Sequence, residues 1–216
     1  MVSEAYAKHI TRSLEVAPVA ISSGSGSFVT DVNGKSYLDF NAGIAANSLG
    51  HCHPEMARVA TAQMGKLIHM SRTYHMEEFA RWAHYMCSLL GFDMAYPMNS
   101  GTEANELAIK YARRFGYDIK KIPDGHAKIV IPYGAFLGRS LTATAAVYDP
   151  VRAARFGPFA PGFVHVRYSD LEALENLFKE DPNICAYLLE PIQGEEGLII
   201  PHKGYLKGVR ELCDKY

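Results

Sequence analysis

Three short stretches combine polar side chains with glycines, and the first is Asn99-Ser100-Gly101-Thr102. It follows an apolar run and opens a helical pattern, so the free N–H groups of the helix start would attract an anion such as a phosphate. Gly101 lets a ligand approach the backbone, and the two hydroxyls can bind it. No lysine follows as in a nucleoside-triphosphate P-loop. The alternative is an ordinary N-cap, in which Ser100 or Asn99 only holds the first turn.

The second stretch is Tyr133 to Ser140, with the sequence YGAFLGRS. Phe136 could stack on a flat ring, and the guanidinium of Arg139 suits a carboxylate because it donates two parallel hydrogen bonds. The alternative is a surface loop with a solvated arginine.

The third stretch is 190–197 (EPIQGEEG), which places Glu195 among other polar groups after an apolar run. The alternative interpretation of this stretch is an acidic turn.

Helical and strand patterns alternate around these stretches. The spacing of apolar residues predicts helices at 54–67, 76–90, 101–116, 170–180 and 205–216. Short apolar runs predict strands at 94–98, 127–132, 163–168 and 184–190, with 197–201 as a further candidate. The alternation predicts an α/β fold with a mostly parallel sheet. In such sheets ligands bind beyond the carboxyl ends of the strands, where all three stretches begin.

Several local signals predict how individual elements begin, turn and end. Residues 28–40 are expected to form a hairpin with a type I′ turn at Asn33-Gly34, and the preceding 22–27 (SSGSGS) a loop. Pro54 is expected to open a helix, because its ring suits the first helical position. Gly116 is expected to end the helix that starts at Gly101. Ser169 is expected to cap the next helix, with Glu172 completing a capping box.

The composition excludes several classes of protein. The 216 residues are 48% hydrophobic and 21% charged, as in ordinary globular chains. The net charge of −1 gives no electrostatic argument for a nucleic acid or a membrane as partner. The four cysteines form no CxxC pair, and His51-Cys52-His53 has no second ligand cluster, so no metal site is expected. No signal peptide or membrane span is evident, which favours the cytoplasm and leaves a mitochondrial location open.

From about residue 18 to 216, five segments together resemble the class III, or ω-amino acid, aminotransferases, with most likeness to the ornithine and acetylornithine enzymes. These segments are GIAANSLGHCHP, MNSGTEANELAIKYAR, AFLGRSL, FGPFAPGF and EPIQGEEGLIIPHKGYLKGVRELC. The resemblance implies a homodimeric enzyme of fold type I that uses pyridoxal 5′-phosphate (PLP), with helices on both faces of its sheet. It also implies two domains. Residues 1–50 would belong to the small domain, and 51–216 to the first part of the large PLP-binding domain, whose remainder is expected to be absent.

The resemblance also implies a role for each matching residue of the cofactor site. Gly101 and Thr102, next to Ser100, match the residues that bind the PLP phosphate. Phe136 matches the aromatic side chain that stacks on the pyridine ring. The family lysine that binds PLP as a Schiff base, and the aspartate that pairs with the ring nitrogen, are expected to lie beyond residue 216. Lys110 is a substitute for that lysine by residue type only, as is Lys120, so this chain alone is expected not to complete the reaction.

On the substrate side, Arg139 matches the arginine that binds the α-carboxylate of the amino acid and then 2-oxoglutarate. Glu195 matches a glutamate that pairs with this arginine. Ornithine aminotransferases place a tyrosine where this chain has Ile44, and Leu14 stands where a second tyrosine is expected. The expected reaction is transfer of the terminal amino group of an ornithine-like ω-amino acid to 2-oxoglutarate. The alternatives are an acetylornithine or 4-aminobutyrate aminotransferase, an incompetent fragment or pseudoenzyme, and an unrelated phosphate-binding module.

Overall fold

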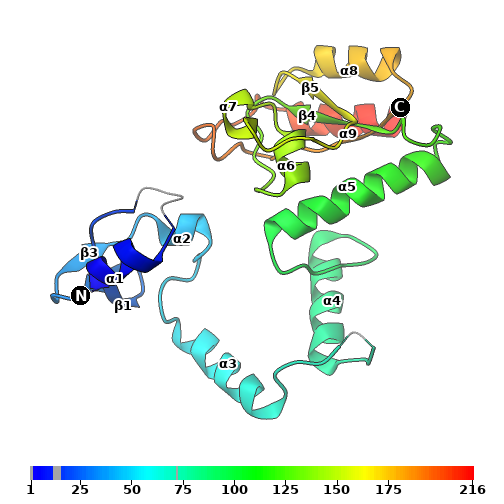
Figure 1. Cartoon of the computed structure of the whole chain (residues 1–216). Helices are drawn as coiled ribbons and strands as arrows, with labels where there is room; N and C mark the ends of the chain where they lie inside the picture. The colour runs from blue at the N-terminus through cyan, green and yellow to red at the C-terminus, as the bar shows by residue number, and fades with distance from the viewer. Residues whose placement is uncertain (1, 12–15, 72) are drawn as a thin grey trace. The chain divides into compact units, whose positions relative to one another are not determined.

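The computed structural model describes residues 2–11, 16–71 and 73–216, and it divides into two compact units, Met1–Asp93 and Met94–Tyr216 (Figure 1). This division by contacts falls at a different place from the domain boundary expected after residue 50. The boundary after residue 50 is expected from the domain organisation of the family that the sequence resembles, and it stays a prediction. Leu14, one of the two positions where a tyrosine is expected, lies outside the described residues.

The N-terminal unit contains helices and one small antiparallel sheet, whose strand order is β1-β2-β3. Its elements are α1 (Val2–His9), β1 (Ile21–Ser25), β2 (Phe28–Asp31), β3 (Ser36–Leu38), α2 (Ala42–Ala45), α3 (Pro54–Lys66) and α4 (Glu77–Leu90). The loop predicted at 22–27 is wrong, because most of it forms β1. Glycine and serine have low strand propensity, but β2 supplies the partner for the backbone of β1.

The hairpin between β2 and β3 is confirmed, but its predicted type I′ turn is wrong. The N–H of Asp31 donates to the carbonyl of Lys35 at 2.9 Å, which leaves three residues in the loop instead of two. Gly34 has a φ of 84°, whereas Asn33 keeps a negative φ. The carboxylate of Asp31 accepts from the N–H of Asn33 (2.8 Å) and of Lys35 (2.9 Å), and these bonds favour the longer loop.

The predicted helix start at Pro54 is confirmed. Pro54 is the first residue of α3, and Gly91 ends α4 in the left-handed conformation with a φ of 72°.

Asp31 is the one buried residue among the described residues of this unit. The apolar faces of α3 and α4 are therefore largely exposed in the structure.

The C-terminal unit is built on a parallel sheet with the strand order β5-β4-β6. Its elements are α5 (Gly101–Asp118), β4 (Lys128–Pro132), α6 (Leu141–Ala146), α7 (Pro150–Ala153), β5 (Phe163–Val166), α8 (Leu171–Glu180), β6 (Ile184–Tyr187) and α9 (Tyr205–Lys215). In the register of the sheet, Val130 of β4 lies opposite Val164 on one side and Tyr187 on the other.

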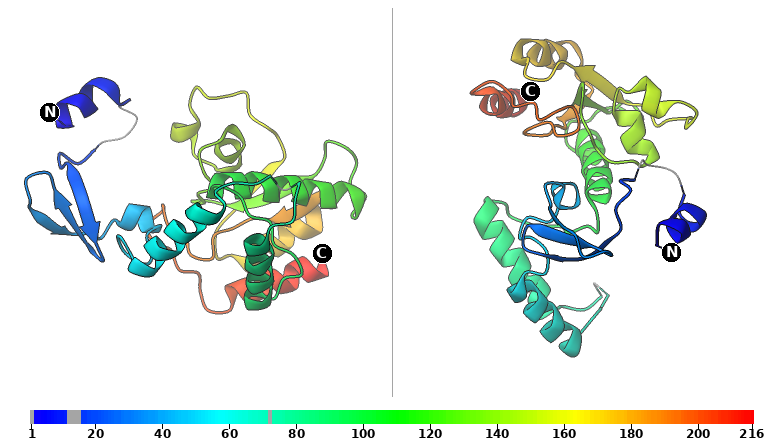
Figure 2. Two further views of the ribbon diagram at one scale, coloured as in Figure 1. Left: turned by 90° about the horizontal axis from the view of Figure 1, so that it is seen from below. Right: turned by 90° about the vertical axis from the view of Figure 1, so that its left-hand side faces the viewer.

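Helices cover both faces of this sheet, as expected for an α/β fold (Figure 2). Successive side chains of a strand point to opposite faces. Ile129 and Ile131 of the central strand β4 pack in one buried cluster with residues of α5 and α6. Val130 packs in a second cluster with residues of α8 and α9. The central strand is thus buried on both sides, which explains its continuous apolar sequence.

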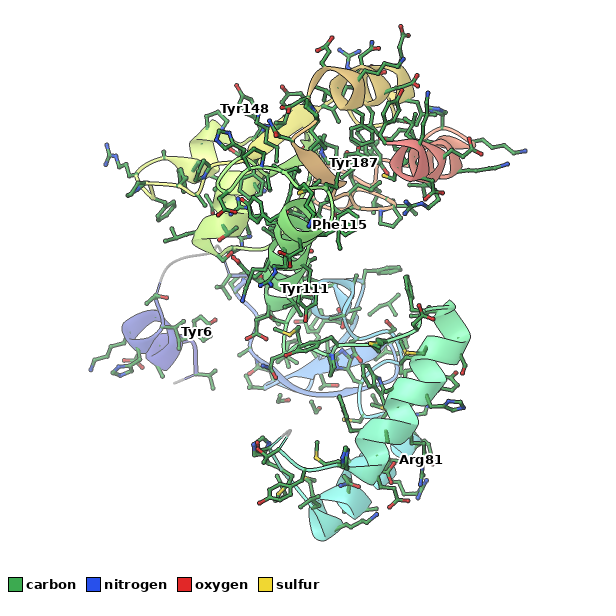
Figure 3. The ribbon with its side chains drawn as sticks, turned by 90° about the vertical axis from the view of Figure 1, so that its right-hand side faces the viewer. Tyr6, Arg81, Tyr111, Phe115, Tyr148 and Tyr187 are labelled. Atoms are coloured by element: carbon green, nitrogen blue, oxygen red, sulfur yellow. The ribbon has the colours of Figure 1, made fainter. Side chains whose placement is uncertain are left out.

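Helix α5 ends at a different residue from the one predicted. Gly116 does not end the helix, which continues to Asp118. A Cβ atom at Gly116 would lie 2.8 Å from the Cβ of Cys185, so the glycine is needed where the helix approaches β6. The buried residues of the helix are Ile109 and Gly116. The apolar side chains of Tyr111 and Phe115, which are labelled in Figure 3, are 57% and 50% exposed.

Three other local predictions in this unit are wrong. Residues 94–98 form no strand, because no other described strand pairs with them. Asp170, not Ser169, caps α8 by accepting from the N–H of Ala173 at 2.9 Å. Ser169 instead has a φ of 66°, and its hydroxyl bonds to Nδ1 of His202 at 2.6 Å. Residues 197–201 contribute a single β-bridge, from Ile199 to Gln193, in place of a strand.

In the part of the chain that the structure describes, no helix is long and apolar enough to cross a membrane. The four cysteines are free thiols. Among residues 2–11, 16–71 and 73–216, no three His, Cys, Asp or Glu side chains form a group that could hold a metal ion.

Candidate functional site

The first stretch forms the start of α5. Ser100 is the N-cap, and its hydroxyl accepts from the N–H of Glu103 at 3.2 Å. The carboxylate of Glu103 accepts from the N–H of Asn99, the residue before the N-cap, at 2.8 Å, so Glu103 and Ser100 hold the helix start together. The predicted N-cap is confirmed, and it is compatible with an anion site, because the first N–H groups of a helix lie outside its own hydrogen-bond ladder. A Cβ atom at Gly101 would have no neighbour within 4 Å, so the backbone there is open to a ligand.

The second stretch lies directly against the start of α5. A Cβ atom at Gly138 would lie 2.9 Å from both Cβ and Cγ2 of Thr102 and closer still to its hydroxyl oxygen. Gly138 also has a φ of 113°, which L side chains rarely adopt. The side-chain amide of Asn105 donates to the carbonyl of Leu137 at 2.9 Å. The structure therefore brings Thr102 and the loop that carries Phe136 together, and glycine at 138 is what permits the close approach.

Phe136 and Arg139 lie side by side in this loop. The guanidinium carbon of Arg139 is 5.7 Å from the centre of the Phe136 ring, within the range of a cation–π contact. Phe136 is half-buried and Arg139 is exposed. Both line a cavity of about 240 Å³, together with Thr144, Asp149 and other residues of α6 and α7. An aromatic ring and a guanidinium at one cavity can bind a flat, anionic ligand.

The third stretch contacts the second through hydrogen bonds to its backbone. Oε2 of Glu190 accepts from the N–H of Phe136 at 3.0 Å. The side-chain amide of Gln193, which is 1% exposed, donates to the carbonyl of Tyr133 at 2.8 Å. Glu195 is exposed and forms no ion pair with Arg139 in the described part of the structure. Its pairing with Arg139 stays a prediction.

Ile44 lies in the N-terminal unit, in a segment with an unusual backbone. It is 81% exposed and has φ 58° and ψ 56°, a left-handed conformation that is rare for a β-branched residue. The segment is anchored at both ends, because Nε2 of His51 donates to Asp39 at 2.7 Å. This bond holds the pKa of Asp39 below its usual value. Strained backbone of this kind is concentrated at functional sites, which agrees with a role for position 44.

The two lysines considered as substitutes for the family lysine lie away from the three stretches. Nζ of Lys120 donates to the carbonyl of Ile184 at 2.6 Å. Lys110 is exposed on α5, nine residues beyond Gly101, which is about 13 Å along a helix. Neither position suggests a role in the candidate site.

Sequence reasoning assigned no role to the side chains that join the three stretches, namely Asn105, Glu106, Tyr168, Glu190 and Gln193, although the last two lie inside the third stretch. Ser140 donates to Glu106 on α5, and the hydroxyl of Tyr168 donates to the carbonyls of Glu190 and Pro191, both at 2.9 Å. Burial raises the pKa of Tyr168, so its hydroxyl stays a donor. The place of Glu190 at the end of a strand is the one signal that could have drawn attention to this group.

Solved structures of similar sequence share this arrangement of elements. Ornithine aminotransferase from Toxoplasma gondii ME49 is 37% identical with a TM-score of 0.95, over 99% of this chain and 50% of that one. Acetylornithine aminotransferase from Elizabethkingia anophelis is 36% identical with a TM-score of 0.83, over 99% and 50% of the two chains. The predicted fold type is therefore confirmed.

Curated relatives point to the same family. The mitochondrial ornithine aminotransferase of Drosophila melanogaster is 47% identical over 199 residues, which are 92% of this chain and 46% of that protein. The mitochondrial enzyme of Rattus norvegicus is 44% identical over 92% of this chain and 45% of its own length. The chain thus spans about half the length of the curated relatives it matches. Residues 10–216 match the family described as aminotransferase class-III, so the chain belongs to this family of PLP-dependent transaminases.

Proposed function

We propose that the protein transfers the terminal amino group of an ornithine-like ω-amino acid to 2-oxoglutarate. The observation that carries this proposal is the close approach of Thr102 to Gly138, in the loop beyond the carboxyl end of β4 that also carries Phe136 and Arg139, because α/β proteins bind their ligands there. Family membership and the identity to ornithine aminotransferases of fly and rat support the reaction class.

The residues present fit PLP. The start of the 18-residue helix α5, with the open backbone of Gly101, suits a phosphate group. The half-buried ring of Phe136 suits one face of a pyridine ring and would exclude water from it. When bound, PLP supplies an electron-withdrawing ring and an aldehyde that reacts with amines. In this proposal Gly101 and Thr102 bind the phosphate. Ser100 caps the start of α5, where these two residues lie.

Arg139 would bind the carboxylate of each substrate in turn, because its exposed guanidinium can form two parallel hydrogen bonds. Glu195 would pair with Arg139 while the ω-amino acid reacts and release it for 2-oxoglutarate. This exchange is plausible because a guanidinium or a carboxylate is costly to leave unpaired in a closed site. Ile44 would contact the donor amino acid in place of the family tyrosine.

Arg139→Lys in the intact protein tests the carboxylate role. Lysine keeps the charge but loses the bidentate geometry, so KM for 2-oxoglutarate should rise roughly tenfold or more. Arg210→Lys on α9, where the arginine pairs with Asp214, is the matched control and should leave KM unchanged. An unchanged KM in Arg139→Lys would remove the main support for the proposal.

Acetylornithine is the second candidate donor. The Elizabethkingia anophelis structure, the GIAANSLGH segment and the absence of tyrosine at position 44 favour it. Ile44→Tyr in the intact protein should raise the ratio of kcat/KM for ornithine to that for acetylornithine. Ile44→Phe, which has the ring without the hydroxyl, is the matched control. If tyrosine leaves the ratio unchanged, position 44 does not select the donor.

We propose a homodimer as the functional state, because the N-terminal unit exposes many large apolar side chains, such as those of Phe40, Ile44 and Ile68. Sedimentation of the intact protein at micromolar concentration tests this, and a monomer would contradict it. The compartment also stays a proposal. The sequence favours the cytoplasm, whereas the fly and rat relatives are mitochondrial, and fractionation of cells distinguishes the two.

A further inference from the structure

Glu190 uses both oxygens of its carboxylate on two different loops. It lies just beyond the end of β6, and its side chain is half-buried. Oε2 accepts from the N–H of Phe136 at 3.0 Å, 54 residues away in the sequence. Oε1 accepts from the N–H of Gly194 at 3.3 Å. One carboxylate therefore joins the loop after β4 to the turn after β6.

Neighbouring side chains fix Glu190 and this turn from other directions. The hydroxyl of Tyr168, just after β5, donates to the carbonyls of Glu190 and Pro191. The buried amide of Gln193 donates to the carbonyl of Tyr133, at the beginning of the loop that Glu190 holds at Phe136. Elements after all three strands of the sheet are thus joined around Glu190, through its carboxylate and its main-chain carbonyl.

We propose that Glu190 is a positioning residue, which sets the ring of Phe136 and the turn that carries Glu195 relative to each other. The functional meaning of those two residues rests on the proposed transaminase activity. A carboxylate suits this task because it only accepts hydrogen bonds and has two oxygens for two N–H donors. Since both oxygens accept from backbone donors, Glu190 acts through Phe136 and Gly194.

Amide hydrogen exchange of the cofactor-free intact protein tests the two hydrogen bonds directly. Glu190→Ala should speed exchange of the Phe136 and Gly194 amides roughly tenfold or more, because a bond to a charged acceptor is lost at each. Glu190→Gln, which has one accepting oxygen, should retain protection at one of the two. Glu172→Gln on α8 is the matched control. The amide of Ile131 in β4 reports whether each variant is folded, and unchanged exchange at both loop amides would overturn the proposal.

Cofactor binding then tests the consequence of this positioning. Glu190→Gln should weaken PLP binding roughly tenfold and change the visible circular dichroism of the bound cofactor, which reports how its ring is held. A role in stability alone would not alter that signal in the folded, saturated variant. If the unaltered protein fails to bind PLP, the proposed function fails, and amide exchange still decides the role of Glu190. If the variant binds PLP with unchanged affinity and dichroism, the role of Glu190 is refuted and the proposed function stands.

Discussion

Replacement of Gly138 by alanine tests the closest approach in the candidate site. Two costs follow from the structure. A φ of 113° is a conformation that alanine rarely adopts, which costs about 1–3 kcal/mol. The new Cβ would also lie 2.9 Å from Cβ and Cγ2 of Thr102, and relief of such a contact costs about 1–3 kcal/mol. Gly138→Ala should therefore destabilise the C-terminal unit by about 2–6 kcal/mol.

Gly125→Ala separates the two costs. Gly125 has a φ of 80°, but a Cβ atom there would have no neighbour within 4 Å. Gly125→Ala should therefore lower the free energy of unfolding only by the backbone contribution, about 1–3 kcal/mol. The remaining difference between the two variants measures the contact with Thr102.

Native-state hydrogen exchange at the buried strand β4 gives the free energy of opening for this unit. The double variant Thr102→Ala/Gly138→Ala removes the hydroxyl and Cγ2 of Thr102, so it should recover part of the loss and show non-additive energies. Equal destabilisation by Gly138→Ala and Gly125→Ala would refute the close packing of the first two stretches. Strict additivity in the double variant would do the same.

Two further predictions concern stability. Ser100→Ala removes the acceptor for the N–H of Glu103 and should cost about 1 kcal/mol, measured by the same exchange experiment. Glu175→Gln tests acid stability. Hydrogen bonds from Lys215, and then from Tyr216, lower the pKa of Glu175 from 4.5 to about 2. A lowered pKa stabilises the folded state fully above about pH 4.5, and this contribution is lost as the pH falls through about 2. The thermal midpoint of the glutamine variant should therefore fall less steeply between these pH values, and identical slopes would contradict the assignment.

Local sequence signals predicted several elements of each unit. Pro54 and Gly91 mark helix ends through their own backbone preferences, which do not depend on distant residues. The apolar run of β4 predicted a buried strand, and β4 is a buried strand in the structure. The chemistry-bearing positions Thr102, Phe136 and Arg139 were also proposed from residue type and spacing, and the structure places Thr102 against Gly138, in the loop that carries the other two.

The failures come from contacts outside the local pattern, some with a neighbouring strand or turn residue and some with residues far along the chain. The strand β1 forms from a Gly/Ser run because β2 pairs with it. Gly116 lies within α5 because Cys185 packs against it, although a helix-terminal glycine looks the same in sequence. The cap of α8 moves to Asp170 because His202 bonds to Ser169.

The sequence by itself determined the alternation of helices and strands, the family and the residues at the strand ends, because each depends on residue type and short-range spacing. Only the tertiary structure decided which side chains join those strand ends. Glu190 and Gln193 reach backbone groups 54 and 60 residues away. A polar side chain can bond to any backbone group that the fold brings within about 3 Å, and no local pattern in the sequence encodes which group that is.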